Sequence, residues 1–230
     1  MTLLSDISEQ IRKDIATGRL ALGERITIDE LSNRYGASHM PVREALRRLM
    51  GEGLVAMEPG RGTRVREVDR AFVANLFETR NALEGVLARA AARYCTHDDV
   101  AELTEIEDNR KRLVDGSDFS GALLLNRRFH SLIHKIGRNP QATEIIDRTW
   151  VLIVALWHQY GYGPDRFAGV ASDHHNMIRA LKAKDSDAAD ILTSAHVLKA
   201  KFDLLEQMTA DEAPVARRQK SKRPMQAVSD

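Results

Sequence analysis

The part of this 230-residue chain that most constrains its fold spans residues 34–65 and reads RYGASHMPVREALRRLMGEGLVAMEPGRGTRV. Apolar side chains first recur three and four residues apart, which predicts one buried face of a helix. Two short strand-like pieces then follow around Pro59-Gly60-Arg61-Gly62, which is typical of a β-hairpin. The segment therefore predicts a helix that leads directly into a hairpin. The buried stripe of that helix consists of Val42, Ala45, Leu46 and Leu49.

Two further helices are predicted before this one. Residues 4–17 carry leucine and isoleucine at helical spacing and read as an amphipathic helix. Asp29 is a suitable first residue for a second helix, and Gly36 is a suitable stop. Ser38 then serves as the N-cap of the third helix, with Pro41 in its first turn. Three helices and a hairpin in this order describe a winged helix-turn-helix, which places its third helix in the major groove of DNA.

Arginine is concentrated in and after the predicted third helix. Residues 38–66 contain six arginines and three glutamates. Arg43, Arg47 and Arg48 lie on the side away from the buried stripe, where arginine can read guanine or hold phosphate. The alternative is a merely solvated helix face, but the complete order of helices and hairpin favours DNA binding. The predicted DNA contacts are Ser38, His39, Pro41, Arg43, Arg47, Arg48, Gly60, Arg61 and Gly62.

After Asp69 the sequence reads as an all-α region. Helices are predicted at 70–94, 98–115, 118–137, 140–160, 172–184 and 186–208. Short breaks between them favour an antiparallel bundle. The expected fold class is therefore mostly α, with a winged helix-turn-helix followed by an all-α antiparallel helical bundle. We divide the chain into a DNA-binding domain at 1–68, a helical domain at 69–209 and a disordered basic tail at 210–230.

The composition fits a globular protein, with 43% hydrophobic residues, 29% charged residues and a formal net charge of +1. Cys95 is the single cysteine, so a reducing compartment is expected. The start of the chain lacks the pattern of a signal peptide. The longest apolar run, Val151–Trp157, is too short to span a bilayer. We therefore expect a cytoplasmic protein that has no membrane partner.

Three predicted helices of the bundle each carry a histidine on an apolar face. These are His130, His174 and His196, and Asn126 lies one helical turn before His130. Three imidazoles and one oxygen are a common ligand set for Zn²⁺ or another late first-row metal. The alternative is that each is an ordinary core histidine, because periodicity does not show that the three faces converge. Three other histidines are assigned to surface or linker positions, namely His134, His158 and His175.

The same periodicity assigns inner faces to two of these helices. In helix 118–137 the inner face is marked by Phe119, Leu123, Phe129, Ile133 and Ile136. In helix 186–208 the main apolar seam consists of Ile191, Ala195, Leu198 and Phe202. We expect both sets of residues to pack against the rest of the bundle.

The chain resembles the N-terminal domain of GntR-superfamily transcription regulators in the motif MPVREALRRLMGEGLV, which is followed by GRGTRV. The usual family pattern is Ser-Arg-Thr-Pro-Val-Arg-Glu-Ala-Leu, and His39 and Met40 stand here in place of Arg-Thr. In the family that arginine helps to read the operator, so the resemblance leaves the operator sequence open. It implies a homodimer on a short palindrome of double-stranded DNA.

Residues 70–208 are similar to the FCD ligand-binding domain of one GntR branch, in the segments FETRNALEGVLARAAAR, NRRFHSLIHKIGRNP and HHNMIRALKAKDSDAADILTSAH. The resemblance implies a divalent metal, Zn with Ni or Mn as alternatives, and a small carboxylate effector. Asn126 stands where the family has aspartate, so weaker or absent metal binding is expected. Arg80 matches the family position that grips the carboxylate; the alternative is a surface arginine paired with Glu84. By this match the metal ligands are Asn126, His130, His174 and His196.

The resemblance also implies a function. The FadR/VanR-like branch contains ligand-responsive regulators, most often repressors, and six bundle helices favour its VanR-like subgroup. Residues 69–209 would then bind the effector and hold the dimer, in a bacterial-type cytoplasm on the nucleoid. A metal-independent regulator that holds its effector through Arg80 and hydrogen bonds is an alternative. Two other classes stay open: a metalloenzyme, for which no general base or nucleophile motif is visible, and an architectural DNA binder.

Overall fold

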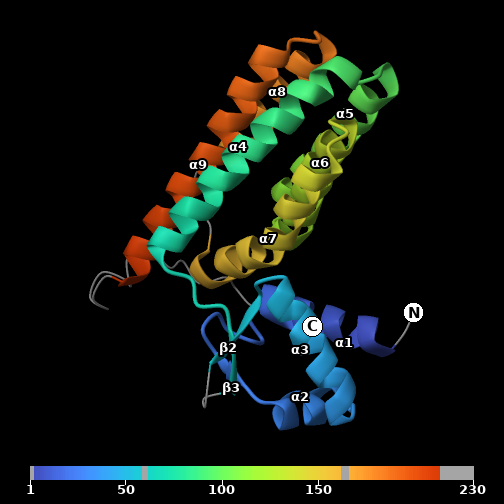
Figure 1. Cartoon of the computed structure of the whole chain (residues 1–230). Coiled ribbons are helices and arrows are strands. Elements are labelled where there is room, and N and C mark those ends of the chain that lie inside the picture. Colours follow the sequence, from blue (N-terminus) through green and yellow to red (C-terminus); the bar gives the residue numbers. More distant parts are fainter. Residues whose placement is uncertain (1–2, 59–61, 162–165, 213–230) are drawn as a thin grey trace.

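The computed structural model describes residues 3–58, 62–161 and 166–212. They form a small N-terminal head and a long helical bundle (Figure 1). The head contains α1 (Leu3–Ala16), β1 (Arg25–Ile26), α2 (Ile28–Tyr35), α3 (His39–Gly51), β2 (Val55–Glu58) and β3 (Gly62–Val65). The bundle contains α4 (Arg70–Tyr94), α5 (His97–Asp115), α6 (Phe119–Ile136), α7 (Pro140–Tyr160), α8 (Arg166–Lys182) and α9 (Ser186–Glu212). The mostly α fold class is confirmed.

The head carries a strand that the sequence pattern did not predict. β1 pairs with β3 and β3 pairs with β2, all antiparallel, so the sheet order is β1-β3-β2. Arg25 lies opposite Arg64, and Val55 lies opposite Val65. β1 has only two residues, too few to show the alternation by which a strand is recognised. The three helices and the hairpin otherwise follow the predicted order.

The start of α2 differs slightly from the prediction. Thr27 rather than Asp29 is the N-cap, because its side chain accepts a hydrogen bond from the Glu30 backbone while the Glu30 carboxylate accepts one from the Thr27 backbone. This capping box satisfies two backbone donors at once and fixes where the helix begins. Gly36 ends α2 with a φ of 61°, and Ser38 precedes α3 as its N-cap without a side-chain capping bond.

The helices α4 to α7 begin and end within one residue of the predicted bounds. α8 begins at Arg166, whereas the predicted helix begins at residue 172. The sequence pattern missed the first turns of this helix, because glycine and proline precede them and Gly169 lies within them. α9 continues to Glu212, so residues 210–212, which were expected in the tail, are helical. The rest of the predicted tail, residues 213–230, lies outside the described residues.

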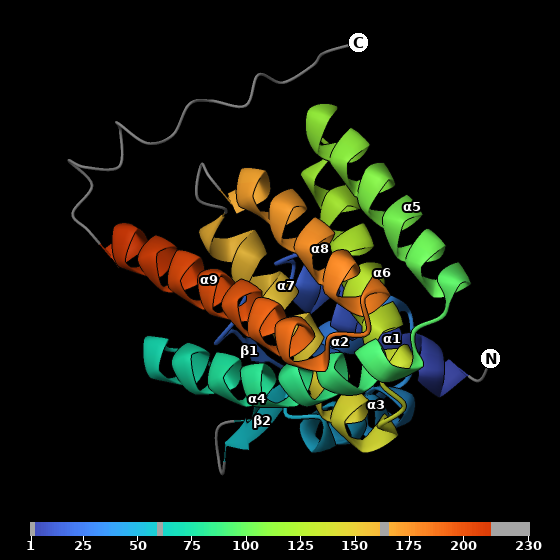
Figure 2. The same cartoon turned by 90° about the horizontal axis from the view of Figure 1, so that it is seen from above.

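α4 and α9 lie side by side along one flank of the bundle (Figures 1 and 2). They run antiparallel, because Arg89 near the end of α4 pairs with Asp187 near the start of α9. At the other end, Arg70 donates hydrogen bonds to the carbonyl of Leu205 and the hydroxyl of Thr209. This pair of long helices therefore forms one wall of the molecule.

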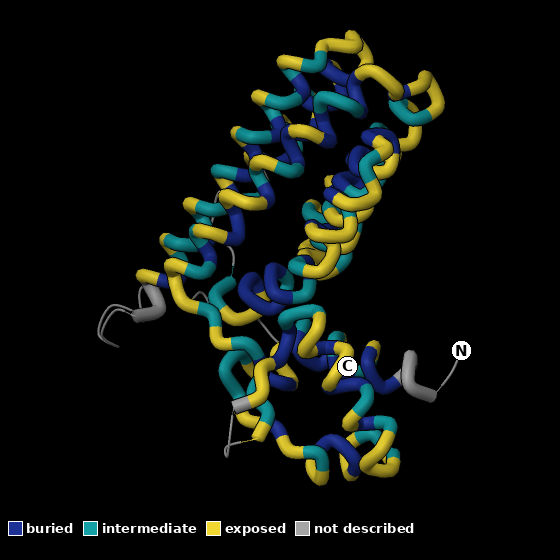
Figure 3. The backbone as a smooth tube through the Cα atoms, viewed as in Figure 1, coloured by how far each residue is buried: buried dark blue, intermediate teal, exposed yellow. Residues whose placement is uncertain are grey.

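α7 connects the head with the bundle. Its residues Leu152 and Ala155 are buried in the core of the head, together with the inner faces of α1, α2 and α3. Its residues Ile153, Leu156 and Trp157 are buried in the core of the bundle. Figure 3 shows the buried residues of α7 where the helix lies between the two regions. One helix thus contributes to two hydrophobic cores.

Two predicted inner faces are partly wrong. Ile191 and Phe202 are 67% and 63% exposed, and Ala195 is also exposed. Phe119 is exposed at the surface, where it stacks on Phe167 with ring centroids 4.8 Å apart. Apolar periodicity does not reveal which face is inside when the buried face carries small and polar residues. The buried positions of α9 include Ala189, Thr193, His196, Val197, Ala200 and Leu204.

Candidate functional site

Three buried histidines meet in the centre of the bundle. His130 comes from α6, His174 from α8 and His196 from α9, and their exposed fractions are 7%, 0% and 3%. One ring nitrogen of each lies within 4.8 Å of the others, and the ring centroids are 5.0 to 5.2 Å apart. The three helix faces therefore converge, which periodicity alone left open.

Two of these histidines have a carboxylate within hydrogen-bond distance of their Nδ1 atom. Oε2 of Glu107 lies 2.5 Å from Nδ1 of His174, and Glu107 also pairs with the buried Arg110. Oδ2 of Asp173 lies 3.2 Å from Nδ1 of His196. A carboxylate on one ring nitrogen orients the imidazole and leaves the other nitrogen for a metal. Nε2 of His174 is buried and has no hydrogen-bond partner among the described residues, which suits a metal ligand.

Glu84 supplies a third carboxylate. Its Oε2 lies 3.8 Å from Nδ1 of His130 and 3.8 Å from Nε2 of His134, and its Oε1 accepts a hydrogen bond from Arg80 at 2.5 Å. Burial by itself would raise the pKa of the Glu84 carboxyl, but Arg80 and the two histidines hold that pKa below its usual range. Glu84 is therefore ionised inside the bundle.

These three carboxylates lie beside the histidines, but each also pairs with a cation. Glu84 pairs with Arg80, Glu107 with Arg110, and Asp173 with Lys199. The carboxylates therefore position the imidazoles, whereas the expectation of weaker or absent metal binding, which rests on the neutral Asn126, stays a prediction. The sequence pattern missed the roles of these acids, because a carboxylate on a helix of mixed polarity looks like a surface charge.

The protonation state of the histidines also suits a metal. Burial lowers the pKa of His130, His174 and His196. The neighbouring imidazole of His196 lowers the pKa of the other two further, whereas Asp173 opposes the shift at His196. Neutral imidazole is the form that coordinates a metal, so the residues present fit a divalent ion at neutral pH.

A small cavity of about 40 Å³ adjoins the histidines. Asn126, His130 and His196 line it together with two cations, Arg80 and Arg166. Its volume is far below the roughly 300–1,000 Å³ of ordinary ligand pockets, so an organic effector enters only if the walls move. Arg166 was not predicted, because the first turns of its helix were not recognised. The apolar wall includes Phe77, Leu123, Trp150, Ile153 and Trp157.

Arg80 is buried, so its alternative assignment as a surface arginine is wrong. Only 7% of it is exposed. The expected pairing with Glu84 is present, and Nη1 of Arg80 also lies 3.4 Å from the carbonyl of Ile146 and from the hydroxyl of Thr149 on α7. Arg80 thus joins the centre of the bundle to α7.

His134 is also buried, contrary to its predicted surface position. Its exposed fraction is 3%. It lies one turn after His130 on α6 and therefore shares the inward face of that helix. Its Nε2 faces Glu84, and its Nδ1 has no hydrogen-bond partner among the described residues. His158 and His175 are exposed, as predicted.

In the head, Arg43 and Arg47 project from α3 beside the strands of the wing. They line a shallow hollow together with Met57 and Thr63. Arg43 is exposed and makes no ion pair with another described residue, whereas Arg47 pairs with Glu44 at 2.7 Å. Within the described part of the chain, Arg43 therefore has no ion pair to break before it contacts an outside partner.

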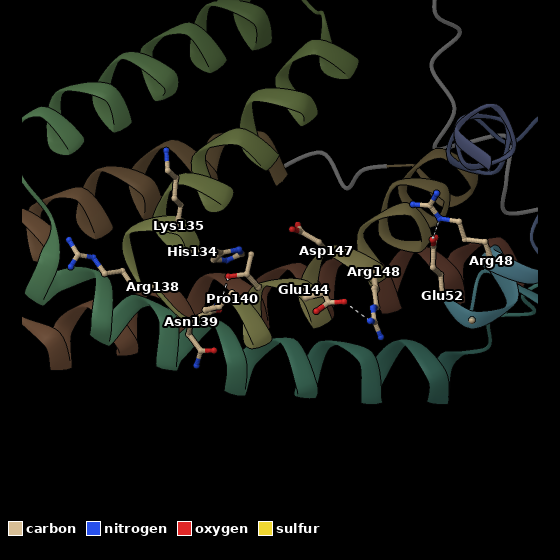
Figure 4. A pocket seen from close by; sticks show the side chains of 12 residues that line it. Arg48, Glu52, His134, Lys135, Arg138, Asn139, Pro140, Glu144, Asp147 and Arg148 are labelled. Carbon is tan, nitrogen blue, oxygen red and sulfur yellow. Dashed lines mark hydrogen bonds and ion pairs between the residues drawn. The ribbon is translucent and has the colours of Figure 1, made fainter. Parts of the chain in front are cut away.

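The remaining predicted DNA contacts are spread around this surface. Nε2 of His39 lies 3.0 Å from Oδ1 of Asp29 at the exposed start of α3. Arg48 pairs with Glu52 at 3.3 Å and lines a pocket of about 750 Å³ between the head and the α6–α7 corner of the bundle (Figure 4). Ser38 and Gly62 are exposed, Pro41 is half-buried, and Gly60 and Arg61 lie outside the described residues.

Comparison with known proteins adds independent evidence. The family model described as bacterial regulatory proteins, gntR family, matches residues 3–65, and the model described as FCD domain matches residues 75–199. The chain is 27% identical over 190 residues to the HTH-type transcriptional regulator McbR of Escherichia coli, covering 81% of this chain and 86% of that protein.

A second relative and a solved structure agree with this match. The chain is 26% identical over 196 residues to a probable D-xylose utilization operon transcriptional repressor of Paenarthrobacter nicotinovorans, covering 85% of this chain and 86% of that protein. The solved structure of E. coli McbR/YncC superposes with a TM-score of 0.78 at 25% identity, covering 91% of this chain and 99% of that one.

Within the residues that the structure describes, no helix is both long and apolar enough to cross a membrane. The two matched families follow one another in the same order as the head and the bundle. The chain therefore belongs to the GntR family of bacterial regulatory proteins and is a DNA-binding transcription regulator with an FCD domain, not an enzyme.

Proposed function

We propose that this regulator is a repressor that binds a palindromic operator as a homodimer and responds to a small carboxylate held beside a divalent metal ion. The observation that carries the proposal is the convergence of His130, His174 and His196 in a bundle joined to a DNA-binding head. The sign of regulation is supported by a relative of similar length that is described as a probable repressor.

The DNA side of the proposal rests on α3. Arg43 is exposed beside the wing and free of internal ion pairs with described residues, so we assign it to a base edge in the major groove. Arg47 lies one turn further and must leave Glu44 to reach DNA, which suits a phosphate contact. Arg48 faces the pocket between head and bundle, so its contact with DNA is the weakest of the three assignments.

The metal would be held by the imidazoles of His130, His174 and His196, with the amide oxygen of Asn126 as the fourth ligand. Zn fits this nitrogen-rich set, and Ni or Mn are alternatives. A bound cation would supply positive charge and a coordination position at the wall of the cavity. The carboxylates behind the imidazoles keep the rings oriented for this role.

The effector would be a small carboxylate, because two guanidinium groups face the same cavity. Arg80 is engaged by Glu84, so an incoming carboxylate competes with Glu84 for it. Arg166 brings a second cation to the cavity. In the alternative without metal, Arg80 and hydrogen bonds from the cavity walls hold the effector.

We assign the coupling between the sites to α7. Arg80 contacts Ile146 and Thr149 of this helix, and Leu152 and Ala155 of the same helix lie in the core of the head. An effector that draws Arg80 away would therefore change how α7 supports the head. A coupling of about 1–3 kcal/mol corresponds to a 5- to 150-fold change in operator affinity, provided the effector binds the two arrangements unequally.

We keep the division into a DNA-binding domain at 1–68 and an effector-binding and dimerisation domain that begins at residue 69. The cap of α4 supports this boundary, because Asp69 accepts a hydrogen bond from the backbone of Phe72. The second domain was expected to end at residue 209, but α9 continues to Glu212. A regulator of this kind acts on DNA in the cytoplasm.

Selection of duplex DNA from a random pool by the full-length chain tests the proposal. We expect enrichment of a short inverted repeat, and we expect a panel of small mono- and dicarboxylates to contain a compound that weakens binding to it. The Arg43→Ala variant serves as the control and should enrich nothing. Enrichment of an unpaired half-site, or of no sequence at all, would contradict the dimeric operator.

A further inference from the structure

The pocket between the head and the bundle has the size of a ligand site. Its volume is about 750 Å³, within the roughly 300–1,000 Å³ of ordinary small-molecule pockets. One wall is the end of α3, and the other is the corner where α6 leads into α7 (Figure 4). It shares no lining residue with the cavity of about 40 Å³ beside the histidines. The pocket is therefore a separate space, which a small molecule can enter without movement of the walls.

His134 brings an unsatisfied polar atom to this pocket. The residue lines the pocket although only 3% of it is exposed. Its Nε2 faces Glu84, and its Nδ1 has no hydrogen-bond partner among the described residues. Because the nitrogen that faces a carboxylate carries the proton of a neutral imidazole, Nδ1 is left as an acceptor. Buried polar atoms rarely stay unpaired, so a hydroxyl group of an occupant would satisfy Nδ1.

Another pocket of about 750 Å³ provides a comparison. Its lining residues come from α4, α5 and α8 and include Cys95 and Lys182. None of its lining residues, all of which lie in the described part of the chain, has a buried side-chain nitrogen or oxygen without a partner. The two pockets therefore differ not in volume but in the free Nδ1 of His134.

Positive charge predominates along the walls of the pocket between head and bundle. Its charged lining residues are four cations and three acids, namely Arg48, Lys135, Arg138, Arg148, Glu52, Glu144 and Asp147. Lys135 is exposed and makes no ion pair with another described residue. Pro140 and Thr143 belong to the first turn of α7, whose N-terminus adds partial positive charge. These features together favour an anion.

Arg48 can turn into the pocket without leaving a carboxylate unpaired. Its Nε lies 3.3 Å from Oε1 of Glu52. Glu52 also accepts two hydrogen bonds from Arg12, at 3.0 and 2.6 Å. This bidentate contact stays when Arg48 leaves, and an exposed ion pair such as Arg48–Glu52 contributes little stability. Arg48 of the head and Lys135 of the bundle are therefore both available to one anion.

We propose that this pocket binds a hydroxylated oxyanion, either a sugar phosphate or a hydroxy polycarboxylate. Its anionic group would lie between Arg48 and Lys135. Its hydroxyl groups would donate hydrogen bonds to Nδ1 of His134 and to Asp147, which makes no ion pair with another described residue. Such a ligand would connect the head directly to the bundle. The inference goes beyond the proposed function, because that function places its effector in the interior cavity.

Isothermal titration calorimetry on the full-length chain, at constant ionic strength, tests the pocket. We expect glucose 6-phosphate or citrate to bind at one site per chain with a dissociation constant below about 1 mM. Arg48→Gln and Lys135→Gln should each weaken that binding roughly tenfold, because each removes a charged hydrogen bond. Lys182→Gln, in the other pocket, is the matched control and should change nothing.

Two results would overturn this assignment. One is the absence of binding by both probes, and the other is an equal loss of affinity in Lys135→Gln and Lys182→Gln. Inorganic phosphate, which has no carbon-bound hydroxyl group, should bind more weakly than glucose 6-phosphate if that is the probe that binds. Equal affinities of these two would contradict the role of His134 and Asp147.

Variants of the interior site separate this inference from the proposed function. His174→Ala and the milder Asn126→Ala change the candidate metal ligands, and both should bind the probe with the affinity of the wild type. Lys135→Gln should keep the metal content of the wild type. If the interior variants lose the probe while Lys135→Gln keeps it, the probe binds beside the histidines, the inference is wrong and the proposed function stands. If no chain contains metal but Lys135→Gln still weakens binding of the probe, the metal in the proposed function is wrong and the pocket stands.

Discussion

Glu84 occupies the point where the interior charges of the bundle meet. One oxygen accepts from Arg80, and the other faces His130 and His134. An ionised carboxylate buried this deeply is stable only with such partners. The same residue therefore orients one predicted metal ligand and restrains the arginine that is expected to grip the effector.

Removing one carboxylate behind the histidines should weaken metal binding. In Asp173→Asn the imidazole of His196 loses a charged partner but keeps a neutral one. Loss of such a partner typically costs 10- to 100-fold in metal affinity. We expect a fall of this size in zinc affinity, measured by competition with a chromophoric chelator. Glu206→Gln on the exposed side of α9 should leave the affinity unchanged, and an equal fall in both variants would refute the role of Asp173.

Two arginines of α3 should differ in their contribution to operator binding. Arg43 is exposed and unpaired among the described residues, whereas Arg48 pairs with Glu52 and faces the pocket shown in Figure 4. A lost bidentate contact to guanine costs about 1–3 kcal/mol, and a homodimer on its operator loses two of them, so Arg43→Ala should weaken specific binding by roughly 30-fold or more. Fluorescence anisotropy at fixed salt should show a smaller loss for Arg48→Ala; the reverse order would contradict the assignment.

At the level of single residues, the sequence predicted the histidines better than their surroundings. His130, His174 and His196 were recognisable because each interrupts an apolar helical face. Glu107 and Asp173 were not, because only the packing of α5 against α8, and of α8 against α9, brings them behind imidazoles. A contact between helices leaves no spacing signal in one sequence.

Among the elements, α7 has the most unusual position. It gives Leu152 and Ala155 to the head and Ile153 and Leu156 to the bundle. Near its end, His158 lies against Gly18 in the loop that follows α1. A shift of α7 would therefore change the packing of the core of the head and of the core of the bundle.

Substitution of Gly18 should show how closely α7 and the head are packed. Gly18 has a φ of 69°, and a Cβ there would lie 2.9 Å from Nδ1 of His158. Gly36 has a similar φ of 61° but nothing within 4 Å of its Cβ position. Both alanine variants should lose roughly 1–2 kcal/mol through backbone strain, and Gly18→Ala should lose more because the ring of His158 must move.

Thermal unfolding followed by circular dichroism measures these differences. The extra loss of stability in Gly18→Ala should disappear when the ring of His158 is absent. The double variant Gly18→Ala/His158→Ala is therefore compared with the single variant His158→Ala. Equal melting temperatures of Gly18→Ala and Gly36→Ala would mean that His158 and Gly18 are not in close contact.

The elements were predictable where local signals are strong. α4 and α7 match their predicted bounds because caps and apolar spacing agree there. β1 is too short to show alternation, and it exists only because β3 offers an edge to pair with. The exposed seam of α9 was misassigned because sequence periodicity reports an apolar face and not what covers it.

At the scale of the whole molecule, the exposed Arg43 lies in the head and the buried histidine cluster lies in the centre of the bundle. In our account the head binds DNA through Arg43, an effector binds beside the histidines, and α7 carries the effect of the effector to the head. The order of the two domains was predictable from the sequence, whereas their packing through α7 was not, because it depends on contacts over more than 100 residues of chain.

The metal content of untagged protein tests the central claim most directly. Elemental analysis should compare the wild type with Asn126→Asp and His174→Ala. The account predicts one divalent ion per chain in the wild type and in Asn126→Asp, because the three converging imidazoles are present in both, and none in His174→Ala, which removes one of them. Metal found only in Asn126→Asp, or a wild type that stays empty after incubation with zinc, nickel and manganese, would contradict it.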